Sequence, residues 1–140
     1  MMFVLDTNVV SELMRPAPAE KVSSWVNAVS RGDLFITTFT QSEILFGIAK
    51  MPNGARRDAL AARAGIMFTD RFRHRILPFD SVAAVHYADI SATRQKRGRP
   101  IAPFDAGIAA IARANAMAVV TRNVRDFEDV GLDVIDPWSE

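Results

Sequence analysis

The sequence predicts an α/β/α sandwich with a central, mainly parallel sheet. Apolar runs such as "MFVLD" and "MAVVT" are too short for buried helices and indicate buried strands. Segments with apolar residues three and four positions apart alternate with these runs, as is typical of amphipathic helices. Strands that alternate with helices form parallel sheets whose two faces are covered by the helices.

The elements follow in order along the chain. Strands are expected at residues 2–6, 34–37, 117–121 and 133–135, with a short strand or a connector at 76–79. Helices are expected at residues 7–14, 19–29, 40–51, 54–76, 81–97 and 103–116. Proline or glycine follows several of these helices and stops them, as Pro16, Pro52 and Gly98 do.

Length and composition bound the class of protein. The chain has 140 residues, of which 49% are hydrophobic, so we expect one domain over residues 1–140 with a core of its own. There is no cysteine, which excludes disulfides and thiolate metal sites. No apolar run approaches the ~20 residues of a membrane span, and the N-terminus lacks a signal-peptide pattern. We therefore expect a soluble, cytoplasmic protein without membrane contact.

The net charge of +1 hides an uneven distribution. Residues 1–49 carry 3 basic and 5 acidic side chains, residues 50–100 carry 11 and 4, and residues 101–140 carry 3 and 7. A basic middle between acidic ends could present a phosphate-binding face beside a cation-binding one. Charge alone favours the simpler interpretation of solvated helix surfaces.

Acidic and amide side chains follow three of the expected strands and also open the helix at 103–116. Asp6 ends the first strand, and Glu43 lies at the start of the helix after the second. Asp105 lies just inside the helix that begins at Pro103. Asn123 and Asp126 follow the strand at 117–121. In open α/β sheets, ligands bind beyond the carboxyl ends of the strands, so these side chains are candidates for one site.

Each acid also has a purely structural interpretation. Asp6 could be the N-cap of the helix that follows it. "TQSE" matches a capping box, with Thr40 as the cap and Glu43 reaching back to it. Asp105, in the first turn of its helix, complements the helix dipole. Taken singly, each acid is more often a helix-terminus residue than a ligand.

Their convergence favours a metal site. Carboxylates gathered within ~5 Å of one another repel strongly, and a divalent cation relieves that repulsion. A ligand set of oxygen atoms alone points to Mg²⁺ or Mn²⁺ and not to zinc. The two histidines, His74 and His86, lie in other segments and are interpreted as surface or partly buried residues.

Four segments carry a resemblance to a known family. They are "FVLDTNVVSEL", "TQSEILFGIAKMPNG", "PFDAGIAAIARANAMAVVTRNVRDF" and "GLDVIDPW". In this order and at this spacing, they resemble PIN-domain ribonucleases and, more narrowly, the VapC/FitB-type toxins of bacterial toxin–antitoxin pairs. The resemblance covers nearly the whole chain, and the stretch at roughly 52–80 is the variable part.

The resemblance implies an α/β/α fold and an endoribonuclease that depends on Mg²⁺ or Mn²⁺. It also implies a homodimer and a cognate antitoxin that forms a hetero-oligomer with the toxin. The metal-binding and catalytic acids of the family fall on Asp6, Glu43 and Asp105. The family's hydroxyl after the first acid falls on Thr7, and its hydroxyl on the last core strand falls on Thr121. These hydroxyls would fix the geometry of carboxylates or water.

One position departs from the family pattern. The family often has a fourth acid directly after "TR", and here that residue is Asn123. Asp126, three residues further on, either replaces this acid or caps the following turn. Arg122 and Arg125 are candidates for contacts with the RNA backbone, although exposed arginines at such a place often have no ligand.

The implied mechanism is hydrolysis of a phosphodiester bond. A bound Mg²⁺ would polarise the scissile phosphate and activate a water molecule. Glu43 is the acid best placed in the pattern to orient or deprotonate that water. In-line attack would leave a 5′-phosphate and a 3′-hydroxyl.

Two other functions remain as alternatives. A haloacid-dehalogenase-type phosphatase also has an aspartate at the end of its first strand, but its chemistry needs a second aspartate where Asn8 stands. A receiver-like or PIN-like binding module without catalytic activity is supported only by Asn123. Metal-dependent RNA cleavage would discriminate between the catalytic and the non-catalytic interpretation.

Overall fold

The computed structural model describes residues 1–139. Its strands are β1 (Phe3–Leu5), β2 (Leu34–Thr37), β3 (Ile76–Leu77), β4 (Ala118–Val120) and β5 (Val134–Ile135). Its α-helices are α1 (Thr7–Leu13), α2 (Glu20–Ala28), α3 (Thr38–Ala49), α4 (Ala55–Ile66), α5 (Ser81–Lys96) and α6 (Pro103–Ala114). Short 3₁₀ turns lie at Arg31–Asp33 and Val124–Phe127, and a π-helical turn lies at Met67–Arg71.

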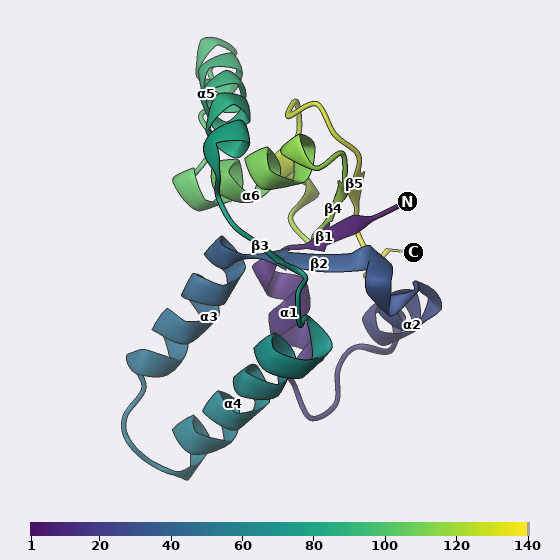
Figure 1. The fold of residues 1–140 in the computed structure, drawn as a ribbon, viewed down its shortest axis with the longest axis vertical. Coiled ribbons are helices and arrows are strands. Elements are labelled where there is room, and N and C mark those ends of the chain that lie inside the picture. Colours follow the sequence, from purple (N-terminus) through teal and green to yellow (C-terminus); the bar gives the residue numbers. More distant parts are fainter. Residues whose placement is uncertain (140) are drawn as a thin grey trace.

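The strands form one five-stranded sheet in the order β3-β2-β1-β4-β5, and every neighbouring pair is parallel. β1 is central, since Val4 is paired with Phe35 on one side and with Val119 on the other. Figure 1 shows α5 and α6 on one side of this sheet and α1, α3 and α4 on the other. The predicted α/β/α sandwich is therefore confirmed, and the carboxyl ends of all strands point to one edge.

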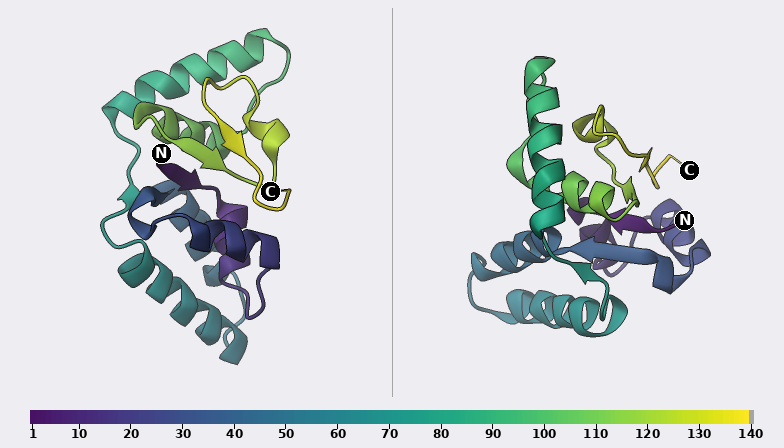
Figure 2. Two further views of the ribbon diagram at one scale, coloured as in Figure 1. Left: turned by 90° about the vertical axis from the view of Figure 1, so that its right-hand side faces the viewer. Right: turned by 45° about the horizontal axis from the view of Figure 1, so that its top comes forward.

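Alternation along the strands produces two cores. Leu5 and Val120 pack with α1 to α4 on one face, whereas Val4 and Val119 pack with α5 and α6 on the other. Such alternation is what the period of two in a strand requires when both faces are buried. The two further views in Figure 2 show the same separation of the helices into two layers.

One expected helix is too long, and one open choice is decided. The helix expected at 54–76 ends at Ile66, and a π-helical turn follows it. The amide of Phe72 donates to the carbonyl of Met67 at 2.9 Å, and the Phe72 ring is fully buried. Burial of this ring turns the chain away from the helix axis. Residues 76–79 contain a true strand, β3.

The helix after β2 begins earlier than expected. It starts at Thr38 with Thr37 as its N-cap, because the Thr37 hydroxyl accepts from the amide of Thr40 at 3.2 Å. Within residues 1–139, no helix has both the length and the apolar character that a membrane crossing requires.

Candidate functional site

Asp6 ends the central strand and faces the carboxyl edge of the sheet. Its amide donates to the carbonyl of Val120 at 2.9 Å, which fixes it to β4. One carboxylate oxygen accepts from the Thr7 amide and the other from the Thr121 hydroxyl, both at 2.8 Å. Asp6 is only 5% exposed. It is thus the N-cap of α1 and also a buried carboxylate tied to the next strand, so the two interpretations from sequence are compatible.

Asn8 joins the same network, although sequence reasoning gave it no role in this site. Its side-chain amide nitrogen lies 3.2 Å from the Thr121 hydroxyl and 3.4 Å from the second oxygen of Asp6. Its side-chain oxygen accepts from the backbone amide of Arg122 at 3.3 Å. Asn8 therefore links the start of α1 to the loop after β4. Its place two residues after Asp6 was the only available signal.

Glu43 is brought to the edge by α3 and is held by Thr7. The Thr7 hydroxyl donates to a carboxylate oxygen of Glu43 at 2.7 Å and lies 3.0 Å from the hydroxyl of Thr40. Thr40 is fully buried inside α3 and does not cap it. The capping-box interpretation of "TQSE" is therefore wrong, and Glu43 is bonded to α1 instead of its own helix end.

Asp105 reaches the edge from the first turn of α6. The helix begins at Pro103, and its N-cap, Ala102, makes no side-chain capping bond. Gly107, two residues after Asp105, packs against the ring of Phe39, because a Cβ at Gly107 would lie 2.3 Å from a ring carbon. The missing side chain thus allows α6 to approach α3 closely.

The acids influence one another electrostatically. Burial raises the pKa of Asp6, hydrogen bonds from Thr121 and Thr7 oppose this rise, and the charges of Glu43 and Asp126 add to it. The pKa of Asp105 is raised to about 6, first by burial and then by the charges of Asp6, Asp126 and Glu43. The raised pKa values show that these carboxylates have too little positive charge near them. A bound cation would supply that charge and would therefore be held favourably.

The segment after β4 places the fourth position. Asn123 and Asp126 are both exposed, and the Asn123 amide donates to the Thr121 hydroxyl at 3.0 Å. Asn123 makes no side-chain capping bond to the 3₁₀ turn that follows. Asp126 raises the pKa of both Asp6 and Asp105, so its charge is felt within the cluster. The choice between Asn123 and Asp126 for the fourth position therefore stays a prediction.

The donor chemistry suits a hard divalent cation. The side chains at this edge offer carboxylate, hydroxyl and amide oxygens, and neither histidine belongs to the cluster. His86 accepts from Arg113, and His74 lies in the turn before β3. Among residues 1–139, no three His, Cys, Asp or Glu side chains already form a group that could hold a metal ion. Binding would thus require small movements of these side chains toward one another.

The sequence matches the PIN domain family over residues 3–132. This chain belongs to the PIN-domain family. The VapC ribonuclease Y4jK of Sinorhizobium fredii is 40% identical to it over 138 residues, which cover 99% of each chain. Toxin FitB of Neisseria gonorrhoeae is 35% identical over 139 residues, covering 99% of this PIN domain and 100% of FitB.

The fold of the chain is also similar to that of a solved structure. The crystal structure of FitAcB from Neisseria gonorrhoeae has a TM-score of 0.92 at 35% identity, and it covers 99% of this chain and 100% of the other. The resemblance to VapC/FitB-type PIN domains is therefore confirmed.

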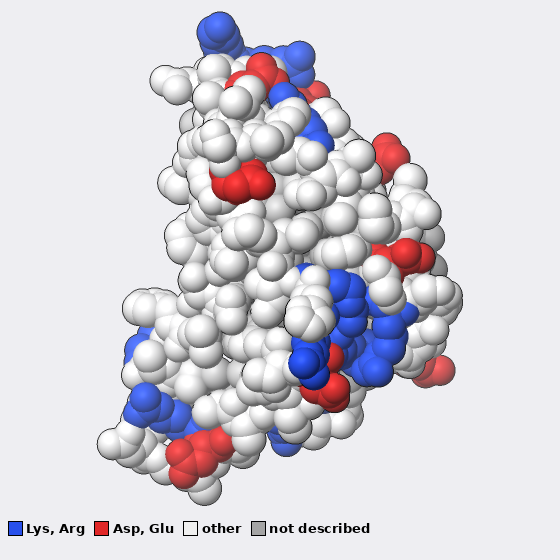
Figure 3. Space-filling model, viewed as in Figure 1, with Lys and Arg blue, Asp and Glu red and all other residues white. Residues whose placement is uncertain are grey.

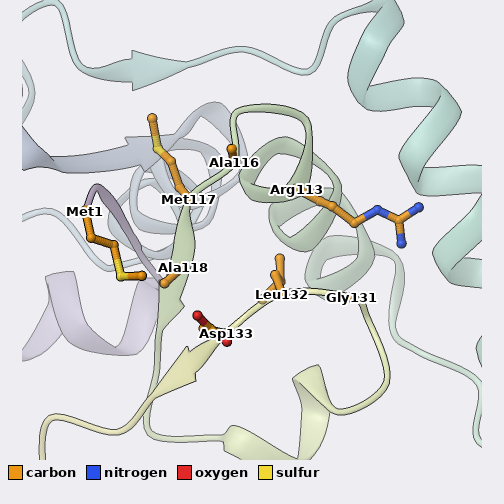
Figure 4. A pocket seen from close by; sticks show the side chains of 8 residues that line it. All are labelled: Met1, Arg113, Ala116, Met117, Ala118, Gly131, Leu132 and Asp133. Carbon is orange, nitrogen blue, oxygen red and sulfur yellow. The ribbon is translucent and has the colours of Figure 1, made fainter.

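One cavity of this PIN domain lies away from the acids. Figure 4 shows a cavity of about 290 Å³ lined by Met1, Arg113, Ala116, Met117, Ala118, Gly131, Leu132 and Asp133. Ala118 begins β4, so this cavity lies at the amino ends of the strands, opposite to the carboxylates. The guanidinium of Arg113 is already bonded to His86, Asp89 and the carbonyl of Val130. We assign no function to this cavity.

The raised pKa of Asp105 predicts how the metal-free fold responds to pH. Its pKa is 3.8 when unperturbed and about 6 in the fold, so the folded state binds the proton more tightly. The resulting stabilisation is complete below the lower value and is lost as the pH rises through the higher one. With allowance for solvent screening of this half-buried group, we expect a loss of about 1 kcal/mol.

Urea denaturation of wild type and Asp105→Asn in EDTA tests this expectation. The two proteins should have equal free energies of unfolding at about pH 3.5, and the variant should be about 1 kcal/mol more stable at about pH 7. A difference that does not change with pH would contradict the raised pKa.

Proposed function

We propose that this PIN domain is an endoribonuclease that depends on Mg²⁺ or Mn²⁺ and acts as the toxin of a toxin–antitoxin pair. The observation that carries the proposal is the placement of three acids at one edge of the sheet: Thr7 is bonded to both Asp6 and Glu43, and Asp105 lies in the first turn of α6. The charges of Asp6 and Glu43 also raise the pKa of Asp105. Kinship with a protein named as a VapC ribonuclease supports RNA as the substrate. The reaction would take place in the cytoplasm, where the RNA is.

Asp6, Glu43 and Asp105 would hold the cation, with Asp126 or Asn123 completing the set. When bound, the cation supplies a Lewis acid beside the scissile phosphate. Glu43 is the best candidate for orienting or deprotonating the attacking water, because it is less buried than Asp6 and is fixed by the Thr7 hydroxyl. In-line attack on phosphorus then releases a 3′-hydroxyl and leaves a 5′-phosphate on the other fragment.

Three side chains would keep the carboxylates in position. The Thr121 hydroxyl donates to Asp6, and the Thr7 hydroxyl donates to Glu43. Asn8 binds the Thr121 hydroxyl and the amide of Arg122, so it fixes the loop that carries the fourth position. Groups that orient metal ligands commonly contribute 10- to 100-fold to affinity or activity.

Arg122 and Arg125 are candidates for contacts with the RNA backbone. Both side chains are exposed and belong to the segment that follows Thr121, whose hydroxyl donates to Asp6. The Arg122 guanidinium lies 5.0 Å from the ring centroid of Trp138, which holds it in a defined place without neutralising it. A guanidinium held in this way can still bind a phosphate with its free edge.

The proposed partners are an antitoxin and a second copy of the chain. A cavity of about 280 Å³ lies next to the acids and is lined by Thr7, Ser11, Met14, Glu43, Ile44, Gly47, Ile48 and Leu60. An apolar antitoxin segment would fit there, with an Arg or Lys reaching the carboxylates. Solved relatives that include toxin–antitoxin complexes support such a partner. Exposed apolar side chains, including Leu45, Phe46, Val82 and Val85, support a homodimer.

Cleavage of RNA in the presence and absence of metal tests the catalytic proposal. We expect purified protein to cleave single-stranded and hairpin RNAs in Mg²⁺ or Mn²⁺ and to lose this activity in EDTA, with recovery when excess Mg²⁺ is restored. The fragments should carry 5′-phosphates, which a 5′-phosphate-dependent exonuclease detects. Metal binding without cleavage of any of these RNAs would instead favour the non-catalytic binding module.

The fourth position can be tested with two variants. Asn123→Asp adds an anionic oxygen, so we expect it to lower the Mg²⁺ concentration for half-maximal cleavage, because ligand charge tunes affinity. Asp126→Ala should raise that concentration, because it removes a negative charge that acts on both Asp6 and Asp105. Cleavage rates measured against Mg²⁺ concentration check both expectations. No shift in either variant would leave a site made by Asp6, Glu43 and Asp105 alone.

A further inference from the structure

Four arginines gather at the edge of the sheet opposite to the carboxylates. Arg31 begins the 3₁₀ turn before β2, Arg71 ends the π-helical turn, and Arg73 and Arg75 lie between that turn and β3. β2 and β3 are parallel neighbours, so the segments before them meet at the amino edge of the sheet. Figure 3 shows a patch of basic side chains in this region, where α4 ends and β2 begins. These four residues are called the arginine cluster.

Arg75 holds the arginine cluster together. Its guanidinium donates to the carbonyl of Leu34 at 2.7 Å and also to the carbonyls of Arg31 and Arg71. It lies 5.6 Å from the ring centroid of Phe72, which is buried. Because Arg75 is bonded to the backbone of both segments, it keeps Arg31 and Arg71 next to each other without any ligand. The cluster is therefore preorganised.

The charge of the arginine cluster is not neutralised within the described part of the chain. Among residues 1–139, the ion pairs involve other arginines, and none involves a member of the cluster. Asp33 and Asp70 belong to the same segments but do not pair with it. Burial lowers the pKa of Arg71, and the positive charges of Arg31 and Arg75 lower it further. Like charges held together in this way repel one another, and a bound anion reduces that repulsion.

Phosphate is the anion that suits this arrangement. Guanidinium groups are planar forks that bind phosphate oxygens through two parallel hydrogen bonds. Arg31 and Arg73 are exposed and Arg71 is half-buried, so their side chains are open to a large ligand. Charges that come from two separate segments favour an extended polyanion over a single small ion.

We propose that the arginine cluster binds backbone phosphates of the RNA substrate, at a distance from the bond that is cleaved. This inference rests on the proposed ribonuclease function. β2 spans four residues between the two edges, which corresponds to about 13 Å of strand. At roughly 3.4 Å for each stacked nucleotide, an RNA must therefore extend about four nucleotides past the cleaved bond to occupy both edges. Long or folded RNAs gain affinity from the cluster, and very short ones do not.

The test compares two double variants with the same change in charge. Arg31→Gln/Arg73→Gln removes the exposed members of the arginine cluster and spares Arg75, which supports the backbone. The control, Lys50→Gln/Arg56→Gln, removes two exposed charges at the far end of α3 and α4, where the described residues form no ion pair with them. Binding is measured by fluorescence anisotropy in EDTA, so that no RNA is cleaved.

The ligands are a hairpin RNA that can span both edges and a dinucleotide that cannot. For the hairpin, we expect Arg31→Gln/Arg73→Gln to raise Kd about fivefold and to reduce the slope of log Kd against log salt by about 1.4. The control variant should stay within about twofold of wild type. Neither variant should change the Kd for the dinucleotide. Arg31→Lys/Arg73→Lys, which keeps the charge but not the planar fork, should recover the salt slope and only part of the hairpin affinity.

Other outcomes overturn the inference. Equal losses in the two double variants would show a general effect of charge, and an unchanged hairpin Kd would show no contact. A loss for duplex DNA with no loss for the hairpin would assign the surface to DNA. If the double variant does not fold by circular dichroism, the single variants are measured, each with a smaller loss expected. Cleavage of the dinucleotide in Mg²⁺ reports separately on the proposed ribonuclease function.

Discussion

Replacing Asp6 or Asp105 with Asn is expected to lower RNA cleavage by at least about 100-fold, because each change removes a charged ligand of the proposed metal. Asn keeps nearly the same shape and still accepts hydrogen bonds, so the fold should survive. The pKa values of both acids are raised in the fold, which means that the metal-free protein tolerates a neutral side chain at each place. Thermal melts in EDTA should therefore show an unchanged or higher midpoint.

Asp58→Asn is the matched control for these two variants. Asp58 is exposed in the first turn of α4, on an element that contributes no acid to the candidate site. The same chemical change at Asp58 should leave cleavage within about twofold of wild type. Full activity in Asp6→Asn or Asp105→Asn would refute the site. If the variant loses activity and its melting temperature also falls steeply, the loss of activity would be due to unfolding instead.

Arg94→Ala is expected to produce the largest loss of stability, about 3 kcal/mol. Arg94 is 5% exposed, and its guanidinium donates to the carbonyls of Arg99 at 2.7 Å and of Asp126 and Glu128 at 3.0 Å each. Its removal leaves these carbonyls without their donor and opens a hole beside the core. Urea denaturation measures the loss as a lower midpoint.

The same variant should also weaken cleavage, because Arg94 holds the turn that carries Asp126. Arg97→Ala serves as the control: Arg97 lies three residues further along the chain, and its ion pair with Asp129 is exposed at both ends. We expect a change within about 0.5 kcal/mol for this exposed pair. Comparable losses in the two variants would contradict a special role for the buried guanidinium.

Arg94 also illustrates what the sequence could not reveal. The excess of arginine over residues 50–100 favoured solvated helix surfaces, and nothing local distinguishes Arg94 from its neighbours on α5. Its acceptors lie up to 34 positions away along the chain. The buried position of Arg94 and the arginine cluster are both consequences of tertiary packing, which periodicity and charge counts do not describe.

The order of strands and helices was predictable because it depends on local patterns. Short apolar runs gave the strands, and apolar residues at helical spacing gave the helices, with errors mainly at their ends. The start of α3 was misplaced because "TTFT" offers several possible caps, and the choice of Thr37 follows from where β2 ends. The π-helical turn was missed because it depends on the burial of Phe72.

The places of Asp6, Glu43 and Asp105 after strands and at helix starts predict them as the acids of the candidate site. Their hydrogen-bond partners were less accessible. Asn8 reaches Thr121, which is 113 positions away, and Thr7 reaches Glu43, which is 36 positions away. Such contacts are decided by the packing of β1 beside β4 and of α1 beside α3. Sequence spacing cannot supply them.

The central place of β1 has a consequence for synthesis on the ribosome. β1 leaves the ribosome first, yet one of its two neighbours, β4, is among the last segments to be made. The hydrogen bond from Thr121 to Asp6 joins residues that are 115 positions apart. Pairing over such a distance occurs late, after the intervening chain is available. We therefore expect a growing chain to lack the proposed ribonuclease activity until β4 has emerged. The messenger RNA and the ribosome that produce the chain would not be cleaved before then.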